Sequence, residues 1–371
     1  MGIWRGSWAA RMVNRGFAGS KSGPRRTDIH DPRFRPYIIK GGNTERGPSP
    51  PVSTEPDFMT ITDALPPGYL LHQYRISKTL GGGGFSIVYL ARDTRTKQLV
   101  VIKEYIPSKD ATRRDGETVE SLSADTATTF NTGMKRFLDE ANALAKINHP
   151  NIVRVIDFFR ENNTVYMVMN YEQGKDLRWY IKRHDGRLSE KFIRTVFPQL
   201  LVGLRELHSH RLLHLDIKPA NVYLRPGGSP LLIDFGAAQS PFVDERRQGP
   251  HTLTRGFAPL EQHTRGHIGP WTDLYAFGAT MWSCMCGKAP PPAIKRAERD
   301  TYKPAVRQFA RRYSRPLLEA VDWCLQMDQL QRPQKVDDLL DFLNKEPAAA
   351  PEPPPESFLD RLTPKFLRGR K

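Results

Sequence analysis

The chain has 371 residues, 39% of them hydrophobic, with 31 prolines and a formal net charge of +16. This length is enough for one large two-lobed domain or two small ones, and the prolines indicate that part of the chain lies outside any packed core. The charge allows attraction to nucleic acid or anionic lipid but does not specify a fold. The three cysteines, Cys284, Cys286 and Cys324, match neither a disulfide framework nor a zinc-ligand spacing, so a reducing compartment, the cytoplasm, is expected.

Residues 1–66 and 346–371 are predicted to lie outside the folded domain. The first segment is rich in Gly, Pro, Ser and Arg without a hydrophobic period, so it is expected to be largely disordered. It lacks the apolar run of a secretory signal, and no stretch of the chain is apolar enough to span a bilayer. The second segment is a Pro-rich linker followed by a basic amphipathic tail. Weak contact of this tail with a membrane surface is conceivable, but Pro364 interrupts it, and a frayed or partner-docked tail is favoured.

The folded part, residues 67–345, is predicted to begin with strands. Short apolar runs at 74–76 and 87–90 flank a glycine turn, and 99–103 is a third strand rich in β-branched residues. A polar, turn-rich insertion is expected over 107–133.

A helix over 134–147 follows this insertion, because its apolar residues recur with a period near 3.6. A strand pair over 152–158 and 165–170 then completes a first half, 67–170. From residue 174 the pattern becomes helical, and one broad apolar face is predicted over 192–208. Further helices are expected over 273–286, 317–327 and 336–344. This order indicates an α+β domain with a small strand-rich half and a larger helical half, 174–345.

A glycine turn and a strand lysine lie in the first half. Residues 80–88 read LGGGGFSIV, and glycines let backbone N–H groups approach phosphate oxygens without a Cβ in the way. Lys103 ends the third strand, and Glu140, on the apolar face of the following helix, is an acid that could hold it. Glu104 and Asp139 are competing acids, of which Asp139 points away from that face.

The run HLDIKPAN, residues 214–221, places a carboxylate, a lysine and an amide close together. Asp216 could accept a proton from an attacking hydroxyl, and Lys218 could neutralise a transferring phosphoryl group. Asn221 could hold a divalent metal, with Asp234 after the next apolar strand as a second oxygen ligand. Each residue alone would be read as a turn former or a surface lysine, but their joint spacing favours phosphoryl transfer.

These motifs resemble those of eukaryotic-like serine/threonine protein kinases of the sort found in bacteria. The glycine turn is similar to G-x-G-x-x-G-x-V with Ser86 as the third glycine, VIK to V-A-I-K, HLDIKPAN to H-R-D-x-x-x-x-N, and DFG to D-F-G. They occur in the family's order along residues 69–345, and Lys218 is typical of the serine/threonine branch. The resemblance implies the two-lobed protein kinase fold, ATP and Mg²⁺ as cofactors, and protein substrates in a signalling role.

The resemblance also implies a role for each site residue. Asn221 and Asp234 would bind Mg²⁺, and Met169 would be the gatekeeper before a hinge that supplies backbone groups to adenine. The residues expected to be catalytic are Asp216, Lys218, Lys103 and Glu140. Those expected to bind ATP are Leu80, Gly81, Gly82, Gly83, Gly84, Phe85, Ser86, Val88, Lys103, Met169, Asn170, Tyr171 and Glu172.

Further residues are expected to brace the site by the same resemblance. The run TRGFAPLEQ from Thr254 is similar to the A-P-E region, and its Glu261 is expected to pair with Arg332. Thr254 matches the threonine that contacts the catalytic aspartate and lysine. Asp273 matches the start of a D-x-Y-x-F-G helix that braces the catalytic loop, although alone it would be read as an N-cap.

One residue departs from the family pattern, because Leu215 stands where H-R-D has arginine. In kinases with that arginine, its side chain receives an activation-loop phosphate and helps to order the loop. Leucine cannot do so. Activity is therefore predicted not to depend on phosphorylation of Ser240 and Thr252.

Other functions are less well supported. A pseudokinase scaffold would use the fold as a binding module, but the residues needed for catalysis and metal binding are all retained. A small-molecule kinase is disfavoured by the glycine turn, residues 256–262 and Arg332. A nucleic-acid binder would explain the charge but none of the motifs, so no specific nucleic acid is expected.

A basic run spans residues 295–315. It is read first as a solvated helical face, and second as a docking patch for an acidic substrate or partner. Its members are Lys295, Arg296, Arg299, Lys303, Arg307, Arg311, Arg312 and Arg315.

Overall fold

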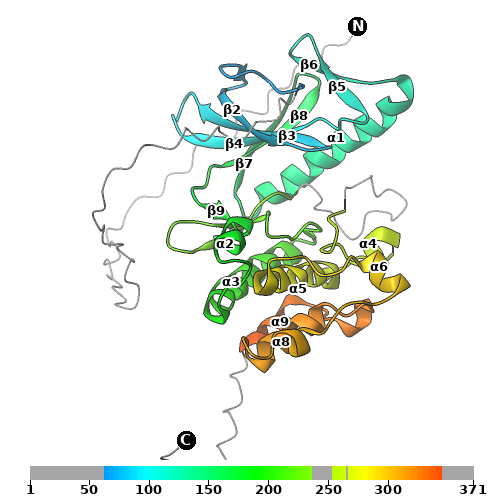
Figure 1. The fold of residues 1–371 in the computed structure, drawn as a ribbon. Coiled ribbons are helices and arrows are strands. Elements are labelled where there is room, and N and C mark those ends of the chain that lie inside the picture. Colours follow the sequence, from blue (N-terminus) through cyan, green and yellow to red (C-terminus); the bar gives the residue numbers. More distant parts are fainter. Residues whose placement is uncertain (1–61, 236–252, 265, 345–371) are drawn as a thin grey trace, which may run out of the picture. The chain divides into compact units, whose positions relative to one another are not determined.

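The computed structural model describes residues 62–235, 253–264 and 266–344, which belong to one compact unit (Figure 1). The predictions of disorder before residue 62 and of a linker and tail after 345 lie outside the described residues. The same is true of Ser240 and Thr252.

The first half is built on a six-stranded antiparallel sheet with the strand order β1-β2-β3-β4-β8-β7. Its strands are β1 (Leu70–Leu71), β2 (Tyr74–Gly82), β3 (Ser86–Asp93), β4 (Leu99–Tyr105), β7 (Val155–Glu161) and β8 (Thr164–Asn170). Asn162 and Asn163 join β7 to β8, with φ of 49° and 56°. Two left-handed residues suit a tight hairpin, and asparagine tolerates that conformation better than most residues. The strand pair is therefore confirmed, but β7 begins at Val155 rather than at the predicted residue 152.

The insertion expected over 107–133 is largely regular structure. It holds a hairpin of β5 (Ala111–Arg114) and β6 (Thr118–Ser121), and α1 (Ala124–Ala145) begins ten residues before the predicted start. Ser123 and Thr126 form a capping box at the start of α1. The sequence did not predict this first part of α1, because its Thr, Asn and Gly residues have weak helix propensity. Tertiary packing compensates, since Phe130 stacks on Tyr105 with ring centroids 5.8 Å apart.

The two faces of β4 have different surroundings. Side chains alternate along a strand, so Lys103 shares a face with Tyr105, whose ring contacts Phe130 and Phe137 of α1. Glu104 points to the opposite face, where it accepts hydrogen bonds from the hydroxyls of Tyr89 (2.6 Å) and Tyr166 (2.5 Å).

Arg113 of β5 completes this second cluster. Its guanidinium lies 2.5 Å from Glu104, and both side chains are almost fully buried. Glu104, Arg113, Tyr89 and Tyr166 are called the outer-face cluster below.

Residues 62–66 pack on the sheet, whereas the domain was expected to begin at residue 67. Leu65 is only 1% exposed, and its N–H donates to the Tyr89 hydroxyl at 3.1 Å. Asp63 accepts hydrogen bonds from the Thr112 hydroxyl (3.0 Å) and the Arg113 N–H (3.2 Å). The sequence did not reveal this because one leucine among polar and proline residues has no periodicity.

The second half is mainly helical. The longer helices are α2 (Leu177–Arg183), α3 (Glu190–Ser209), α5 (Pro270–Cys286), α8 (Arg315–Cys324) and α9 (Val336–Asn344). The shorter ones are α4 (Leu260–Thr264), α6 (Ala293–Glu298), α7 (Ala305–Gln308) and a 3₁₀ helix (Gln329–Gln331). A small sheet of β9 (Lys175–Asp176), β10 (Val222–Leu224) and β11 (Pro230–Leu232) lies at the start of this half.

Helix α5 forms the centre of the helical half, between α3 and α8 (Figure 1). Nearly all of its residues are buried, which explains why it is apolar around most of its circumference. The predicted α+β architecture is therefore confirmed, although α2 was not anticipated. Within the described residues, no helix combines the length and the apolarity needed to cross a bilayer.

Candidate active site

Asp216 is the centre of a hydrogen-bonded cluster on the loop between α3 and β10. Its carboxylate accepts from the Thr254 hydroxyl (2.8 Å) and the Asn221 amide (2.9 Å), and lies 2.8 Å from the Lys218 ammonium. Lys218 also donates to the Thr254 hydroxyl at 3.1 Å. Four residues expected at one site are thus in direct contact, and the Asp216 side chain keeps 21% of its surface exposed.

The buried Asp273 carboxylate holds this loop in place. It accepts the N–H groups of His214 (2.9 Å) and Leu215 (2.7 Å), and His208 of α3 contacts it at 2.8 Å. Leu215 has φ of 59°, a left-handed conformation that is unfavourable for leucine. Asp273 offsets this strain through both backbone hydrogen bonds.

Lys103 reaches across from the sheet to Asp234, which follows β11. The ammonium is 2.5 Å from the carboxylate, and the side chains are 7% and 48% exposed respectively. The Lys103 charge lowers the pKa of Asp234. Burial alone would lower the pKa of Lys103, but the facing carboxylates outweigh it and raise that pKa.

Glu140 does not pair with Lys103 in this structure, which differs from the expected arrangement. Among the described ion pairs Lys103 is joined to Asp234, and Glu140 Oε1 is buried without a hydrogen-bond donor. Burial raises the pKa of Glu140 to about 8, although Lys103 acts in the opposite direction. Asp139 is exposed, and Glu104 belongs to the outer-face cluster, so neither competing acid lies beside Lys103.

The glycine turn lies between β2 and β3. Gly81, Gly83 and Gly84 have ordinary negative φ, and a Cβ at each would meet no atom within 4 Å. Glycine is therefore not required here by backbone conformation or by contact with the protein. Open space beside the backbone is what a phosphate group needs for close approach. The other predicted nucleotide contacts from this motif, Leu80, Phe85, Ser86 and Val88, occupy the adjoining strand ends and the turn.

The predicted hinge lies at the end of β8. Met169 is buried and pairs with Val101 of β4, one residue before β8 ends at Asn170. The Asn170 N–H donates to the Arg154 carbonyl at 3.0 Å, so this N–H is already engaged within the protein. The N–H groups of Tyr171 and Glu172 have no acceptor among the described residues.

Two oxygen ligands are placed for a divalent cation. The Asn221 amide nitrogen donates to Asp216, so its amide oxygen is the atom left for a metal, and Asp234 supplies a carboxylate. In the described part of the chain no group of three or more His, Cys, Asp or Glu could hold a metal ion. An amide and one carboxylate fit Mg²⁺, which is usually bound by few protein ligands together with waters and substrate phosphates.

Glu261 of α4 forms a bidentate pair with Arg332. The oxygen–nitrogen distances are 2.6 and 3.2 Å, and the two residues are only 7% and 2% exposed. Thr272 donates to the same carboxylate at 3.1 Å, and the guanidinium lies over the Tyr275 ring. The contacts fix the segment that follows Thr254 against α5.

Leu215 packs in a small apolar cluster instead of pointing into solvent. Its side chain is 9% exposed and groups with Leu213 and Ile268. The Gln262 amide donates to the Leu215 carbonyl at 3.0 Å. The position where the family pattern has arginine is thus filled by an apolar contact.

Three supporting residues were not anticipated. His208 bonds Asp273, Gln262 bonds the Leu215 carbonyl, and Arg225 forms a bidentate pair with Glu172 of the predicted hinge at 2.7 and 2.9 Å. The only available signal was that they are polar residues beside motifs, and this does not distinguish them from surface residues.

The basic run over 295–315 is not one uniform surface. Arg296 is 5% exposed and binds Asp300, the Tyr275 hydroxyl and the Leu325 carbonyl, so it cannot belong to a docking patch as expected. Its spacing alone could not reveal this, because the burial comes from packing against α5. The remaining cations of the run are exposed.

Comparison with known proteins identifies one family. A model described as "Protein kinase domain" matches residues 74–342. Serine/threonine-protein kinase D of Synechocystis sp. (strain ATCC 27184 / PCC 6803 / Kazusa) is 32% identical over 60% of this chain and 42% of its own length. Serine/threonine-protein kinase F of the same organism is 28% identical over 76% of this chain and 57% of its own length.

A solved structure, "PpkA-294 apo form", matches with a TM-score of 0.66 and 33% identity over 76% of this chain and 99% of that one. CBL-interacting protein kinase 16 of Oryza sativa subsp. japonica is 30% identical over 60% of this chain and 45% of its own length. The chain therefore spans about half of the length of these curated relatives, or less.

Proposed function

The chain belongs to the protein kinase family, as its motifs predicted, and we propose that it transfers the γ-phosphoryl group of ATP to serine or threonine hydroxyls of proteins. The observation that carries the proposal is the contact of Asp216 with Lys218, Thr254 and Asn221. The proposed kinase domain comprises residues 67–345, and Asp63 and Leu65 pack against it.

The proposed mechanism gives each side chain a task. Asp216 orients the substrate hydroxyl and accepts its proton, and Lys218 stabilises the negative charge that develops on the transferring group. Thr254 holds Asp216 and Lys218 in register through its hydroxyl. When bound, ATP with Mg²⁺ supplies the phosphoryl group and the charge neutralisation between its phosphates.

A second group of residues is proposed to bind the nucleotide and its metal. The glycine turn and Lys103 would contact phosphates, Asn221 and Asp234 would hold Mg²⁺, and the 170–172 hinge would bind adenine. Glu140 would form the ion pair with Lys103 once Mg²⁺ binds Asp234, because one carboxylate cannot bind both cations fully. This exchange would give the buried Glu140 oxygen a partner.

Purified protein tests the proposal directly. With ATP and Mg²⁺ it should phosphorylate serine- and threonine-containing peptides but not matched tyrosine peptides. Asp216→Asn should lower turnover by about a thousandfold while nucleotide affinity stays within a few fold. Equal turnover in wild type and Asp216→Asn would refute the assignment of Asp216.

The competing function is a scaffold that binds nucleotide without turnover. The unpaired Glu140 supports this reading, since a permanently absent Lys103–Glu140 pair would disable phosphate positioning. Nucleotide binding with no autophosphorylation and no peptide phosphorylation, under conditions where the protein is folded, would establish the scaffold.

We further propose that the kinase does not require phosphorylation of its activation loop. The packing of Leu215 with Leu213 and Ile268 supports this, because a leucine at this position cannot bind a phosphate as an arginine would. Ser240→Ala with Thr252→Ala should keep turnover within about twofold of wild type. Loss of turnover in that variant, with unchanged thermal stability, would disprove it.

A cytoplasmic location completes the proposal. All three cysteines are unpaired, and Cys284 and Cys324 are buried, which fits a reducing compartment.

A further inference from the structure

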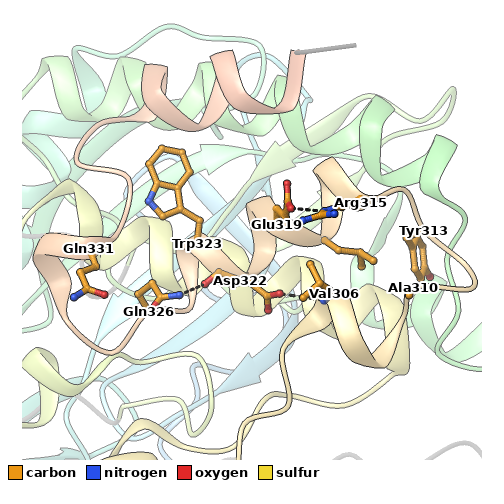
Figure 2. A pocket seen from close by; sticks show the side chains of 10 residues that line it. Val306, Ala310, Tyr313, Arg315, Glu319, Asp322, Trp323, Gln326 and Gln331 are labelled. Carbon is orange, nitrogen blue, oxygen red and sulfur yellow. Dashed lines mark hydrogen bonds and ion pairs between the residues drawn. The ribbon is translucent and has the colours of Figure 1, made fainter. Parts of the chain in front are cut away.

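Arg225, which follows β10, joins distant segments of the chain. Many surface ion pairs join residues four apart in one helix, as Arg315 and Glu319 do in the wall of a pocket beside α7 and α8 (Figure 2). The Arg225 guanidinium instead binds Glu172 of the predicted hinge, 53 residues away along the chain, through two hydrogen bonds of 2.7 and 2.9 Å. Two parallel bonds fix the direction of a carboxylate as well as its distance.

The same guanidinium also holds the loop between α1 and β7. It donates to the Pro150 carbonyl at 2.7 Å. The neighbouring Asn151 is bonded to β11, since its side-chain amide donates to the Pro230 carbonyl (2.7 Å) and its backbone carbonyl accepts from the Leu232 N–H (2.8 Å). Arg225 therefore links the predicted hinge to a loop that is itself fixed to the helical half.

The segment after Glu172 is held against β10. The Tyr223 hydroxyl donates to the Gly174 carbonyl at 2.7 Å, and β9 pairs with β10 directly after this glycine. Gly174 has φ of 149°, and a Cβ there would lie 2.1 Å from the Leu224 carbonyl oxygen, so the close approach to β10 requires glycine. Residues 172–176 are therefore fixed at both ends, by the Glu172 ion pair and by β9.

Two backbone donors without an acceptor in the described residues lie at the start of this segment. They are the N–H groups of Tyr171 and Glu172, whereas the Asn170 N–H already donates to the Arg154 carbonyl. Holding the Glu172 side chain limits the directions in which these two N–H groups can point. Donors that already point in the bound direction raise affinity, because less conformational entropy is lost on binding.

Stability is a weak explanation for the Arg225–Glu172 pair. Its side chains are 24% and 23% exposed, and ion pairs with this much contact to water contribute little to the free energy of unfolding. The main effect of the pair is therefore expected on the geometry of the predicted hinge and not on stability.

We propose that Arg225 is a positioning residue for the nucleotide, because it holds Glu172 so that the N–H groups of Tyr171 and Glu172 face an adenine base. The proposal rests on the proposed function for the identity of the ligand. It requires no contact between Arg225 and the nucleotide.

Binding of ADP with Mg²⁺, measured by titration calorimetry on the full chain, tests the proposal. Arg225→Ala should weaken this binding by about tenfold, and adenosine, which has no phosphates, should lose affinity by the same factor. In peptide phosphorylation the same variant should raise KM for ATP by about tenfold, while kcat at saturating ATP stays within about twofold of wild type.

Two further variants separate positioning from a general loss of stability. Glu172→Ala should also weaken ADP binding, and the double variant should bind ADP no more weakly than Arg225→Ala, because both changes break the same pair. Arg194→Ala on α3 is the matched control. Its guanidinium pairs with Glu190 at 2.6 Å and donates to the Leu343 carbonyl at 2.9 Å, and the paired side chains are similarly exposed, 27% and 24%. This variant should keep ADP affinity within about twofold of wild type.

The outcomes distinguish failure of one proposal from failure of the other. If wild type binds ADP without phosphorylating any peptide and the affinity losses are found, the kinase activity is refuted and the positioning role stands. If wild type phosphorylates peptides and Arg225→Ala binds ADP like wild type, only the positioning role is refuted. Additive losses in the double variant, or an equal loss in Arg194→Ala, would also overturn the positioning role. Failure of wild type to bind either ADP or adenosine would refute both proposals.

Discussion

Strand β4 carries one charged side chain on each of its faces, Glu104 on one and Lys103 on the other. The two side chains differ in how many partners surround them. On the outer face, Glu104 has two tyrosine hydroxyls and a guanidinium within 2.6 Å. On the inner face, Lys103 pairs with one carboxylate, while Glu140 Oε1 is buried and receives no hydrogen bond from the described residues.

The difference separates a structural cluster from a functional one. A buried charge that faces a counter-charge and hydroxyl donors fixes the local geometry, whereas a buried carboxylate without a counter-charge is a reservoir of free energy. On the inner face, the unsatisfied group is the Glu140 carboxylate, beside the place where a nucleotide and a metal are proposed to bind. Binding can therefore rearrange the inner face without disturbing the outer one.

The largest expected effect is on activity and comes from the inner face. Lys103→Ala should lower kcat/KM for peptide phosphorylation by about a thousandfold or more, because a charge aimed at the phosphates is lost. The free energy of unfolding should change by no more than about 1 kcal/mol, since Asp234 is 48% exposed and can be solvated. Lys135→Ala, an exposed lysine on α1, is the control and should change neither quantity.

The next effect is on stability and comes from the outer face. Glu104→Leu should lower the free energy of unfolding by about 3–5 kcal/mol, because it leaves the Arg113 guanidinium buried without a counter-charge. Glu104→Leu with Arg113→Leu should recover most of this loss in urea denaturation. If the double variant is less stable than the single one, the loss arises from packing and not from the stranded charge.

A smaller, pH-dependent effect is expected for Glu140. Its folded pKa is about 8, above the usual 4.5, so the folded protein binds this proton more tightly than the unfolded chain does. The associated stability is fully present below pH 4.5 and is lost as the pH rises from 4.5 to 8. Glu140→Gln, which stays neutral, should gain about 2–3 kcal/mol of stability relative to wild type between pH 6 and pH 9.

Asp139→Asn, at an exposed position on the same helix, should show no such trend. A stability difference between Glu140→Gln and wild type that is constant with pH would mean that Glu140 is already ionised in the folded protein.

The smallest effect concerns the segment that supports the outer face. Asp63→Ala should lower the free energy of unfolding by about 1 kcal/mol through loss of its hydrogen bonds to Thr112 and Arg113. Glu117→Ala changes an exposed side chain of the same hairpin and should have almost no effect in the same urea titration.

The motifs of the site could be predicted because their spacing is short and their chemistry is specific. Asp216, Lys218 and Asn221 lie within one loop, and the structure brings Thr254 to them from further along the chain. Asp273 and the Glu261–Arg332 pair also lie where the family pattern implied.

What could not be predicted depends on packing between distant segments. Nothing in the sequence shows that Lys103 contacts Asp234 rather than Glu140, because the choice depends on how α1 and the residues after β11 pack against the sheet. The early start of α1 and the burial of Arg296 likewise come from tertiary contacts that override weak propensity or a charged pattern. The order of strands and helices was predictable because hydrophobic periodicity reports it locally.

The contacts of residues 62–66 also decide where the chain can be shortened. A variant trimmed to the family boundary, residue 74, would lose Leu65 and β1, leave the Tyr89 hydroxyl without its backbone donor, and free Arg113 from Asp63. Such a protein would expose the outer surface of the sheet and invite aggregation during expression. A trimmed kinase for crystallisation should therefore keep Asp63 and Leu65.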